Sequence, residues 1–261
     1  MNHEAEAFFV ASSHRARALF MTYFGGSNDE GFVLCNPAPQ DMMRAGPSQI
    51  LLAKKLQELG FPTLRFDYTG TGDSSGTIID LAQWKQDLLE AVQTLRKKSG
   101  VHKISLIGTR LGATLALLVS QEIGFKRLLL WDPILDGEQL LREYRDAHHH
   151  ILHRVPVEAP YPENQVSPDQ SCGYFWPYQI REDIASITPR SLTTFCKDIS
   201  VVVHELSPEL DQLLASWRAE GKEADLFHEG DDMRWGHHRL MTMQAFPAAS
   251  IRILTHIAVG R

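Results

Sequence analysis

The chain has 261 residues, 43% of them apolar, and a formal net charge of -6. This length and apolar fraction suit one α/β domain with a single large core. The acidic balance gives no reason to expect a nucleic acid or an anionic membrane surface as a partner. Three scattered cysteines fit a reduced, cytoplasmic protein without a disulfide framework.

Membrane and targeting segments are not expected. No apolar run approaches the ~18 residues that suggest a membrane span. The first residues, Met-Asn-His-Glu-Ala-Glu-Ala, lack the basic and apolar regions of a signal peptide.

Strand and helix patterns alternate along the chain. Residues 17–23 and 31–35 are expected to form an antiparallel hairpin that opens the sheet, with residues 8–12 as a further edge strand. The other predicted strands are 63–66, 103–107, 127–131, 199–204 and 224–227, and the predicted helices are 48–59, 81–98, 111–121, 138–153 and 208–219. This alternation predicts an α/β fold, with a mostly parallel sheet and helices on both faces.

Residues 137–195 interrupt the alternation. A charged helical segment is followed there by a proline-rich stretch and an aromatic run, Tyr174 to Tyr178. The sequence therefore predicts a core made of residues 1–136 and 196–261, with residues 137–195 forming a helical cap insert.

The most informative segment is the strand-to-helix turn Gly108-Thr-Arg-Leu-Gly112. Its spacing matches the G-x-S-x-G turn in which hydrolases hold their nucleophilic serine. The glycines are expected for steric reasons, because flanking side chains would collide with neighbouring backbone in so tight a turn. Arg110 stands where the nucleophile would be, and a protonated guanidinium cannot attack a carbonyl.

Catalytic candidates follow from position and chain order. Ligands bind beyond the carboxyl ends of the strands in an open α/β sheet, and the hydrolase order is nucleophile, acid, histidine. Arg110, then Asp132 or Glu205, then His237 or His238 reproduces this order with its first member replaced. We prefer His237 because a glycine precedes it, so the candidate catalytic residues are His237, Glu205 and Asp132.

The loop after Cys35 is where an oxyanion hole would form, together with the backbone N–H of Leu111. Pro37 and Pro39 lack an N–H, so Ala38 or Gln40 would have to serve as the donor. The candidate substrate-binding residues are therefore Arg110, Leu111, Asn36, Ala38 and Thr109.

Other polar motifs are interpreted as structural. The run 66–74, FDYTGTGDS, suits tight turns, and the Gly-Lys-Ser/Thr of a phosphate loop is absent. Histidines 148–150 and 153 could supply only half a metal site from one helix face. Cys172 lies off the turn with no evident base. We therefore expect no metal and no cofactor.

These motifs carry a resemblance to known families. The FDYTGTGDS run and the Gly108–Gly112 turn resemble the serine-aminopeptidase-like branch of the α/β-hydrolases over roughly residues 15–260. The Gly108–Gly112 turn, residues 130–140 and Cys172–Tyr174 are similar to the "hydrolase 2" proteins associated with exosortase A systems, which also tend to carry arginine inside the turn. The resemblance implies the α/β-hydrolase fold.

Three functions stay open from the sequence. An atypical hydrolase or acyl-transfer enzyme would bind an anionic acyl or sugar derivative through Arg110, with His237 activating water. A catalytically inactive binding or scaffold protein would instead pair Arg110 with Asp132 or Glu205. Serine-type hydrolysis from Ser74, Ser105 or Thr109 is disfavoured, because none occupies the centre of the turn. The expected partner is a small, anionic molecule, and the oligomeric state is not set by the sequence.

Overall fold

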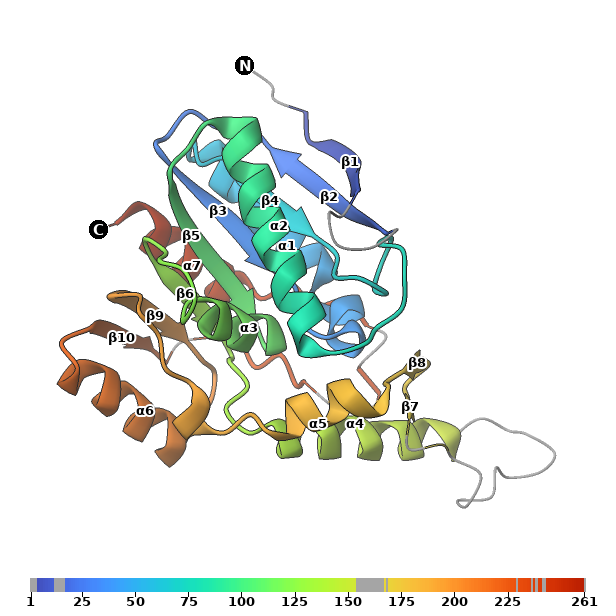
Figure 1. The fold of residues 1–261 in the computed structure, drawn as a ribbon. Coiled ribbons are helices and arrows are strands. Elements are labelled where there is room, and N and C mark those ends of the chain that lie inside the picture. Colours follow the sequence, from blue (N-terminus) through green and yellow to red (C-terminus); the bar gives the residue numbers. More distant parts are fainter. Residues whose placement is uncertain are drawn as a thin grey trace.

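The computed structural model describes residues 4–11, 17–153, 167, 169–228, 230–235, 237, 239–240 and 243–260. An eight-stranded sheet runs through the molecule (Figure 1) in the order β1-β2-β4-β3-β5-β6-β9-β10. Its strands are β1 (Glu6–Ala11), β2 (Ala18–Phe24), β3 (Glu30–Cys35), β4 (Thr63–Phe66), β5 (Lys103–Thr109), β6 (Leu128–Trp131), β9 (Asp198–Val202) and β10 (Glu223–Phe227). The pairs β1–β2 and β2–β4 are antiparallel, and all other pairs are parallel.

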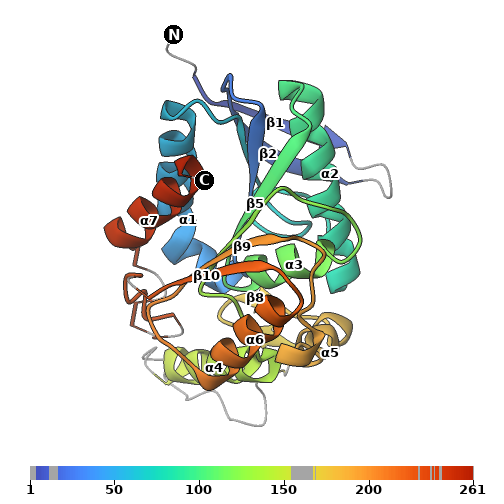
Figure 2. The ribbon, with the colours of Figure 1, turned by 90° about the vertical axis from the view of Figure 1, so that its left-hand side faces the viewer.

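Helices cover both faces of this sheet (Figure 2). The helices are α1 (Pro39–Glu58), α2 (Leu81–Ser99), α3 (Leu111–Val119), α4 (Gly137–Leu152), α5 (Tyr178–Ala185), α6 (Pro208–Ala219) and α7 (Ala248–Val259). The apolar sides of α1 and α7 pack on one face, through side chains such as Leu52 and Leu254. The apolar sides of α2, α3 and α6 pack on the other, through side chains such as Trp84 and Trp217. The mostly parallel sheet covered on both faces is confirmed.

The central strands are continuous apolar runs because both of their faces are covered. Every residue of β3 and β6 is buried, and so are all residues of β5 except Lys103. Such runs are typical of parallel strands that lie between two helix layers. Local signals set the helix ends: Asp80 caps α2 by accepting from the Gln83 N–H at 2.7 Å, and Gly100 ends it in the left-handed conformation.

The predicted hairpin of residues 17–23 and 31–35 is wrong. β2 pairs with β1 on one side and with β4 on the other, so β4 lies between β2 and β3. The link after β2 is held away from a hairpin because the N–H groups of Ser27 and Asn28 both donate to the Gly60 carbonyl, in the loop before β4. β1 does lie at the edge of the sheet as predicted, although Ser12 falls outside the described residues.

The first helix begins earlier than predicted, at Pro39 instead of Ser48. Proline fits the first turn of a helix because its missing N–H would have no intrahelical partner there. Pro47 lies inside the helix. The last helix, α7, was not predicted from the sequence.

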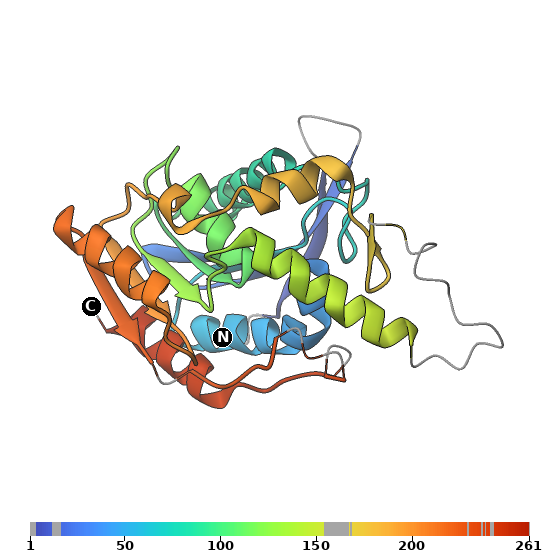
Figure 3. The same ribbon diagram turned by 90° about the horizontal axis from the view of Figure 1, so that it is seen from below.

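The 137–195 segment contributes α4, α5, the short strands β7 (Gln170–Ser171) and β8 (Tyr174–Phe175), and a 3-10 turn at Pro189–Ser191. Seen from below, α4 and α5 lie side by side across the lower end of the molecule (Figure 3). This is the end at which the parallel strands have their carboxyl termini (Figure 1). The predicted proline-rich stretch of this segment lies mostly outside the described residues.

Candidate functional site

The turn between β5 and α3 holds Arg110 in an uncommon backbone conformation, with φ 53° and ψ -123°. A residue other than glycine rarely occupies this region, and the strain is held only where the surroundings fix it. An added Cβ on Gly108 would lie 2.3 Å from the Ala113 Cα, and one on Gly112 would lie 2.3 Å from the Asn36 carbonyl oxygen. Both glycines are therefore required by close backbone contacts, as the sequence indicated.

The Arg110 side chain is buried and paired with two carboxylates. Its Nη2 lies 2.6 Å from Oε2 of Glu143 on α4, and its Nε lies 3.4 Å from Oδ2 of Asp41 on α1. The Tyr144 hydroxyl donates to the same Asp41 oxygen at 2.7 Å. Burial by itself lowers the pKa of Arg110, but the Asp41 and Glu143 carboxylates outweigh it and raise that pKa above its usual value. The guanidinium is thus a fixed cation whose charge is already balanced.

These partners differ from those expected for a neutralised Arg110. The sequence suggested Asp132 or Glu205, whereas the ion pairs are made with Asp41 and Glu143. Asp41 lies in the early turns of α1 that the sequence did not indicate, and Glu143 comes from the 137–195 segment.

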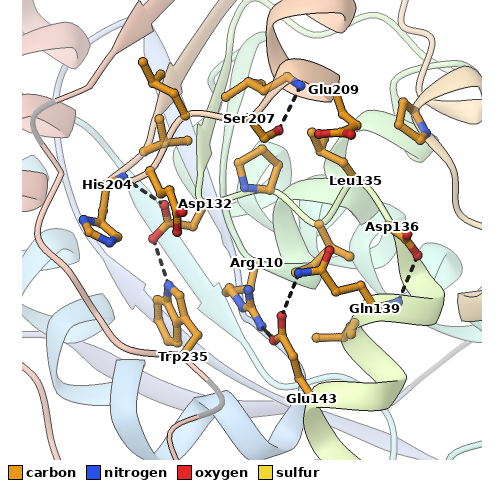
Figure 4. Close-up of a pocket in the computed structure, with 18 of the residues that line it drawn as sticks. Arg110, Asp132, Leu135, Asp136, Gln139, Glu143, His204, Ser207, Glu209 and Trp235 are labelled. Carbon is orange, nitrogen blue, oxygen red and sulfur yellow. Dashed lines mark hydrogen bonds and ion pairs between the residues drawn. The ribbon is translucent and has the colours of Figure 1, made fainter.

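Asp132 follows β6 and is also held in a positive-φ conformation, at 45°. Its Oδ2 accepts the indole N–H of Trp235 at 2.8 Å, and its Oδ1 accepts the backbone N–H of His204 at 3.3 Å (Figure 4). Burial raises the pKa of Asp132, and the Trp235 hydrogen bond and the Arg110 charge only partly oppose this.

Trp235 connects the two groups. Its ring centroid lies 5.6 Å from the Arg110 Cζ, while its Nε1 points to Asp132 (Figure 4). An arginine over a tryptophan face is a favourable cation–π contact. Arg110, Trp235 and Asp132 thus form a continuous series of contacts at the carboxyl ends of β5 and β6.

A cavity of about 520 Å³ opens beside this series. The loops after β6 and β9, helices α4 and α6, and the segment around Trp235 contribute to its wall. Its charged residues are Arg110, Asp132, Asp136, Glu143, Glu205, Glu209, Asp232 and Arg234. Its position beyond the carboxyl ends of the strands is the usual place for a ligand in an open α/β sheet.

The predicted catalytic residues are separated. Asp132 and Glu205 both line the cavity, together with Arg110. His237 is exposed and does not line this cavity, and its backbone N–H donates to the Arg234 carbonyl at 3.2 Å. His238, the other candidate, lies outside the described residues.

The other predicted substrate-binding residues pack in the core beneath the turn. The side chains of Asn36, Ala38, Thr109 and Leu111 are all buried, and none of these residues lines the cavity. The Asn36 amide donates to the Phe66 carbonyl and to Asp67, at 2.6 and 3.0 Å. The Thr109 hydroxyl accepts from the Gln49 amide at 2.6 Å. The side-chain amide of Asn36 and the hydroxyl of Thr109 are thus engaged within the protein.

Sequence reasoning missed His204 and Trp235. The Nε2 atom of His204 lies 3.6 Å from Oδ1 of Asp232, and both residues line the cavity. The signal for His204 was its place at the end of the predicted strand 199–204. No sequence signal pointed to Trp235, because it lies in a segment without hydrophobic periodicity.

Over the described ranges, no group of three or more histidine, cysteine or acidic side chains is arranged to hold a metal ion. None of the described helices combines the length and apolar character needed to cross a bilayer.

No family model and no curated protein matches the sequence. Solved structures do match the fold. A candidate hydrolase from Agrobacterium vitis S4 is 19% identical with a TM-score of 0.63, and the match covers 99% of this chain and 98% of that one. Mouse alpha/beta hydrolase domain-containing protein 10 is 17% identical with a TM-score of 0.60 and 97% coverage of both chains. An esterase of Pyrococcus furiosus is 14% identical with a TM-score of 0.61, covering 86% of this chain and 81% of its own. The chain therefore has the α/β-hydrolase fold.

Proposed function

We propose that this protein binds a small molecule non-covalently in the Arg110–Asp132 cavity and performs no serine-type hydrolysis. The observation that carries the proposal is the state of Arg110. In α/β-hydrolases the centre of the strand-to-helix turn holds the attacking side chain. Here that place holds a buried cation, tied to Glu143 and Asp41 at 2.6 and 3.4 Å.

The position of the base supports the same proposal. In a Ser-His-Asp triad, the acid accepts one ring N–H of the histidine, and the other ring nitrogen takes the proton of the nucleophile. The Asp132 carboxylate here accepts the N–H of Trp235 instead. An indole has that single N–H donor and no acceptor nitrogen, so it cannot take up a proton. In the part of the chain that the structure describes, the place of the nucleophile and the place beside the Asp132 carboxylate are thus held by Arg110 and Trp235, and neither side chain can act as nucleophile or base.

The 137–195 segment acts as a cap in this proposal. Gln139 and Glu143 of α4 line the cavity, and Glu143 is bonded to the core through Arg110. We also propose the cytoplasm as its location, since no disulfide joins Cys35, Cys172 or Cys196. The similarity to exosortase-associated proteins rests on the sequence motifs alone.

A second candidate is hydrolysis by an activated water molecule. The pair of His204 and Asp232, 3.6 Å apart at the cavity wall, is the observation that favours it. A neutral imidazole held by a carboxylate can act as a general base. Such an enzyme would need no side-chain nucleophile.

Hydrolysis of p-nitrophenyl acetate by the wild type and by His204→Ala separates the candidates. The binding proposal expects the same release rate from both proteins, equal to that of a protein blank of matched concentration. A wild-type rate well above the blank that disappears in His204→Ala would replace it with the water-activating enzyme. A high rate that survives in His204→Ala would contradict both.

A further inference from the structure

The charges that line the cavity are unbalanced. Six carboxylates face it, against two guanidiniums, Arg110 and Arg234. Both guanidiniums are already paired within the protein: Arg110 with Glu143 and Asp41, and Arg234 with Asp232 through Nε and Oδ2 at 3.3 Å. Neither is left to attract an anion.

The cap residues of three helices line the cavity; those of α6 and α4, Ser207 and Asp136, each accept one N–H of their own helix, whereas Arg110 gives α3 no side-chain cap. The Ser207 hydroxyl accepts the Leu210 N–H of α6 at 3.1 Å, and the Asp136 carboxylate accepts the Gln139 N–H of α4 at 2.9 Å. An acidic residue, Glu209, follows in the first turn of α6. At α4 and α6 the partial positive charge of the helix start, which otherwise favours anions, is thus partly offset by protein groups.

Some of the acidic side chains keep their acceptor capacity. Among the described residues, neither Glu205 nor Glu209 makes a side-chain hydrogen bond or ion pair, and both line the wall. Asp132 lies deeper, and each of its oxygens accepts one N–H. A carboxylate oxygen has room for a further donor. The cavity therefore offers acceptors at its rim and at its base.

From this arrangement we infer that the cavity takes a cationic ligand, of the class of alkylamines with one or two primary ammonium groups. The inference rests on the proposed non-covalent binding function and names its ligand class. Its ammonium groups would be bound by the carboxylates of Asp132 and Glu205, which both line the cavity and can accept ammonium N–H donors. The result replaces the anionic ligand that the sequence suggested, because the cation at position 110 is already neutralised.

The test uses three probes of equal chain length: hexamethylenediamine, hexanediol and adipate. Binding is measured by titration calorimetry on the full chain, at low and at high salt. We expect the diamine to bind best, hexanediol more weakly and adipate not at all. Added salt should weaken the binding of the diamine, because salt screens the attraction between its ammonium groups and the carboxylates.

Matched variants locate the binding. Glu205→Gln removes one negative charge from the wall, and Glu182→Gln removes one from an exposed site on α5 that does not line the cavity. We expect Glu205→Gln to weaken diamine binding about two- to fivefold, as for a partly exposed charge pair, and Glu182→Gln to leave it unchanged.

Adipate binding as tightly as the diamine overturns the cationic assignment, and so does an equal effect of the two variants. No binding of the diamine at millimolar concentration overturns it as well. If adipate binds, or if hexanediol binds as tightly as the diamine, and this binding depends on cavity residues, the proposed binding function stands while this inference fails. Ester hydrolysis above the blank overturns the proposed function, whichever probe binds.

Discussion

Removal of Arg110 should destabilise the protein strongly. Arg110→Ala leaves Asp41, which is 3% exposed at its side chain, and Glu143, which is 29% exposed, without their cation. Breaking a buried pair by removing one partner costs about 3–5 kcal/mol, because an uncompensated charge stays behind. Asp41 keeps its hydrogen bond from Tyr144 and Glu143 can reach water, so we expect a value near the lower limit.

The effect is measurable as a shift in melting temperature. For a domain of this size each kcal/mol corresponds to about 2–4 °C, so the loss should be about 6–12 °C. Arg142→Ala is the matched control on the same helix. Its pairs with Asp136 and Glu138, at 4.0 and 3.9 Å, are exposed and should contribute less than about 1 kcal/mol.

A double variant tests the cause of the loss. Adding Asp41→Asn to Arg110→Ala removes the stranded charge and should restore part of the lost stability, whereas Asp41→Asn alone should be destabilising. An Arg110→Ala protein that melts within a degree of the wild type would refute the reasoning. In that case the guanidinium would be an uncommitted anion-binding group and not a fixed structural cation.

Three further predictions follow from single contacts. Gly112→Ala should lower the free energy of unfolding, measured by urea denaturation, by about 1–3 kcal/mol, because the added Cβ would lie 2.3 Å from a backbone carbonyl oxygen. The control, Gly124→Ala, has nothing within 4 Å of its Cβ and should change this free energy by less than about 0.5 kcal/mol. Equal effects of the two variants would contradict the tight turn. Burial raises the pKa of Asp87 from 3.8 to about 6, so the folded chain holds this proton more tightly than the unfolded chain. The free energy of unfolding should therefore fall by up to about 3 kcal/mol as pH rises from about 4 to 6 and level off above. Asp87→Asn should remove this fall, and an unchanged pH dependence in the variant would exclude Asp87 as its origin. Trp235→Phe removes the donor to Asp132 at 2.8 Å and should destabilise by about 1–3 kcal/mol in the same assay, and no loss would show that this hydrogen bond is dispensable.

The layered fold could be predicted because its signals are local. Continuous apolar strands such as β5 and capped helices such as α2 indicate a parallel sheet covered on both faces. The order of the strands in the sheet could not be predicted in this way, because strand pairing joins segments that lie far apart in the chain. Nothing in residues 17–35 showed that β4 would lie between β2 and β3. The start of α1 was predicted too late, at Ser48, and the helix continues through Pro47 although proline is unfavourable in a helix interior.

The site was predictable only where backbone geometry demanded it. Gly108 and Gly112 fix the turn and therefore the place of Arg110. The partners of Arg110 come from α1 and α4, and no sequence spacing links Asp41 or Glu143 to the turn. Trp235 likewise reaches Asp132 only in the folded chain, across 103 residues. Tertiary contacts of this kind leave no periodic or motif signal.

The absence of a covalent nucleophile is the central claim, and intact-mass spectrometry after incubation with a fluorophosphonate tests it most directly. A serine hydrolase, run in parallel as the positive control, gains the mass of one phosphonyl group on its active serine. We predict that this protein keeps its unmodified mass under the same conditions. Arg110 occupies the position of the nucleophile, and the Asp132 carboxylate accepts a hydrogen bond from Trp235 instead of from a histidine. Stoichiometric modification of a single serine, mapped by fragmentation, would contradict the account.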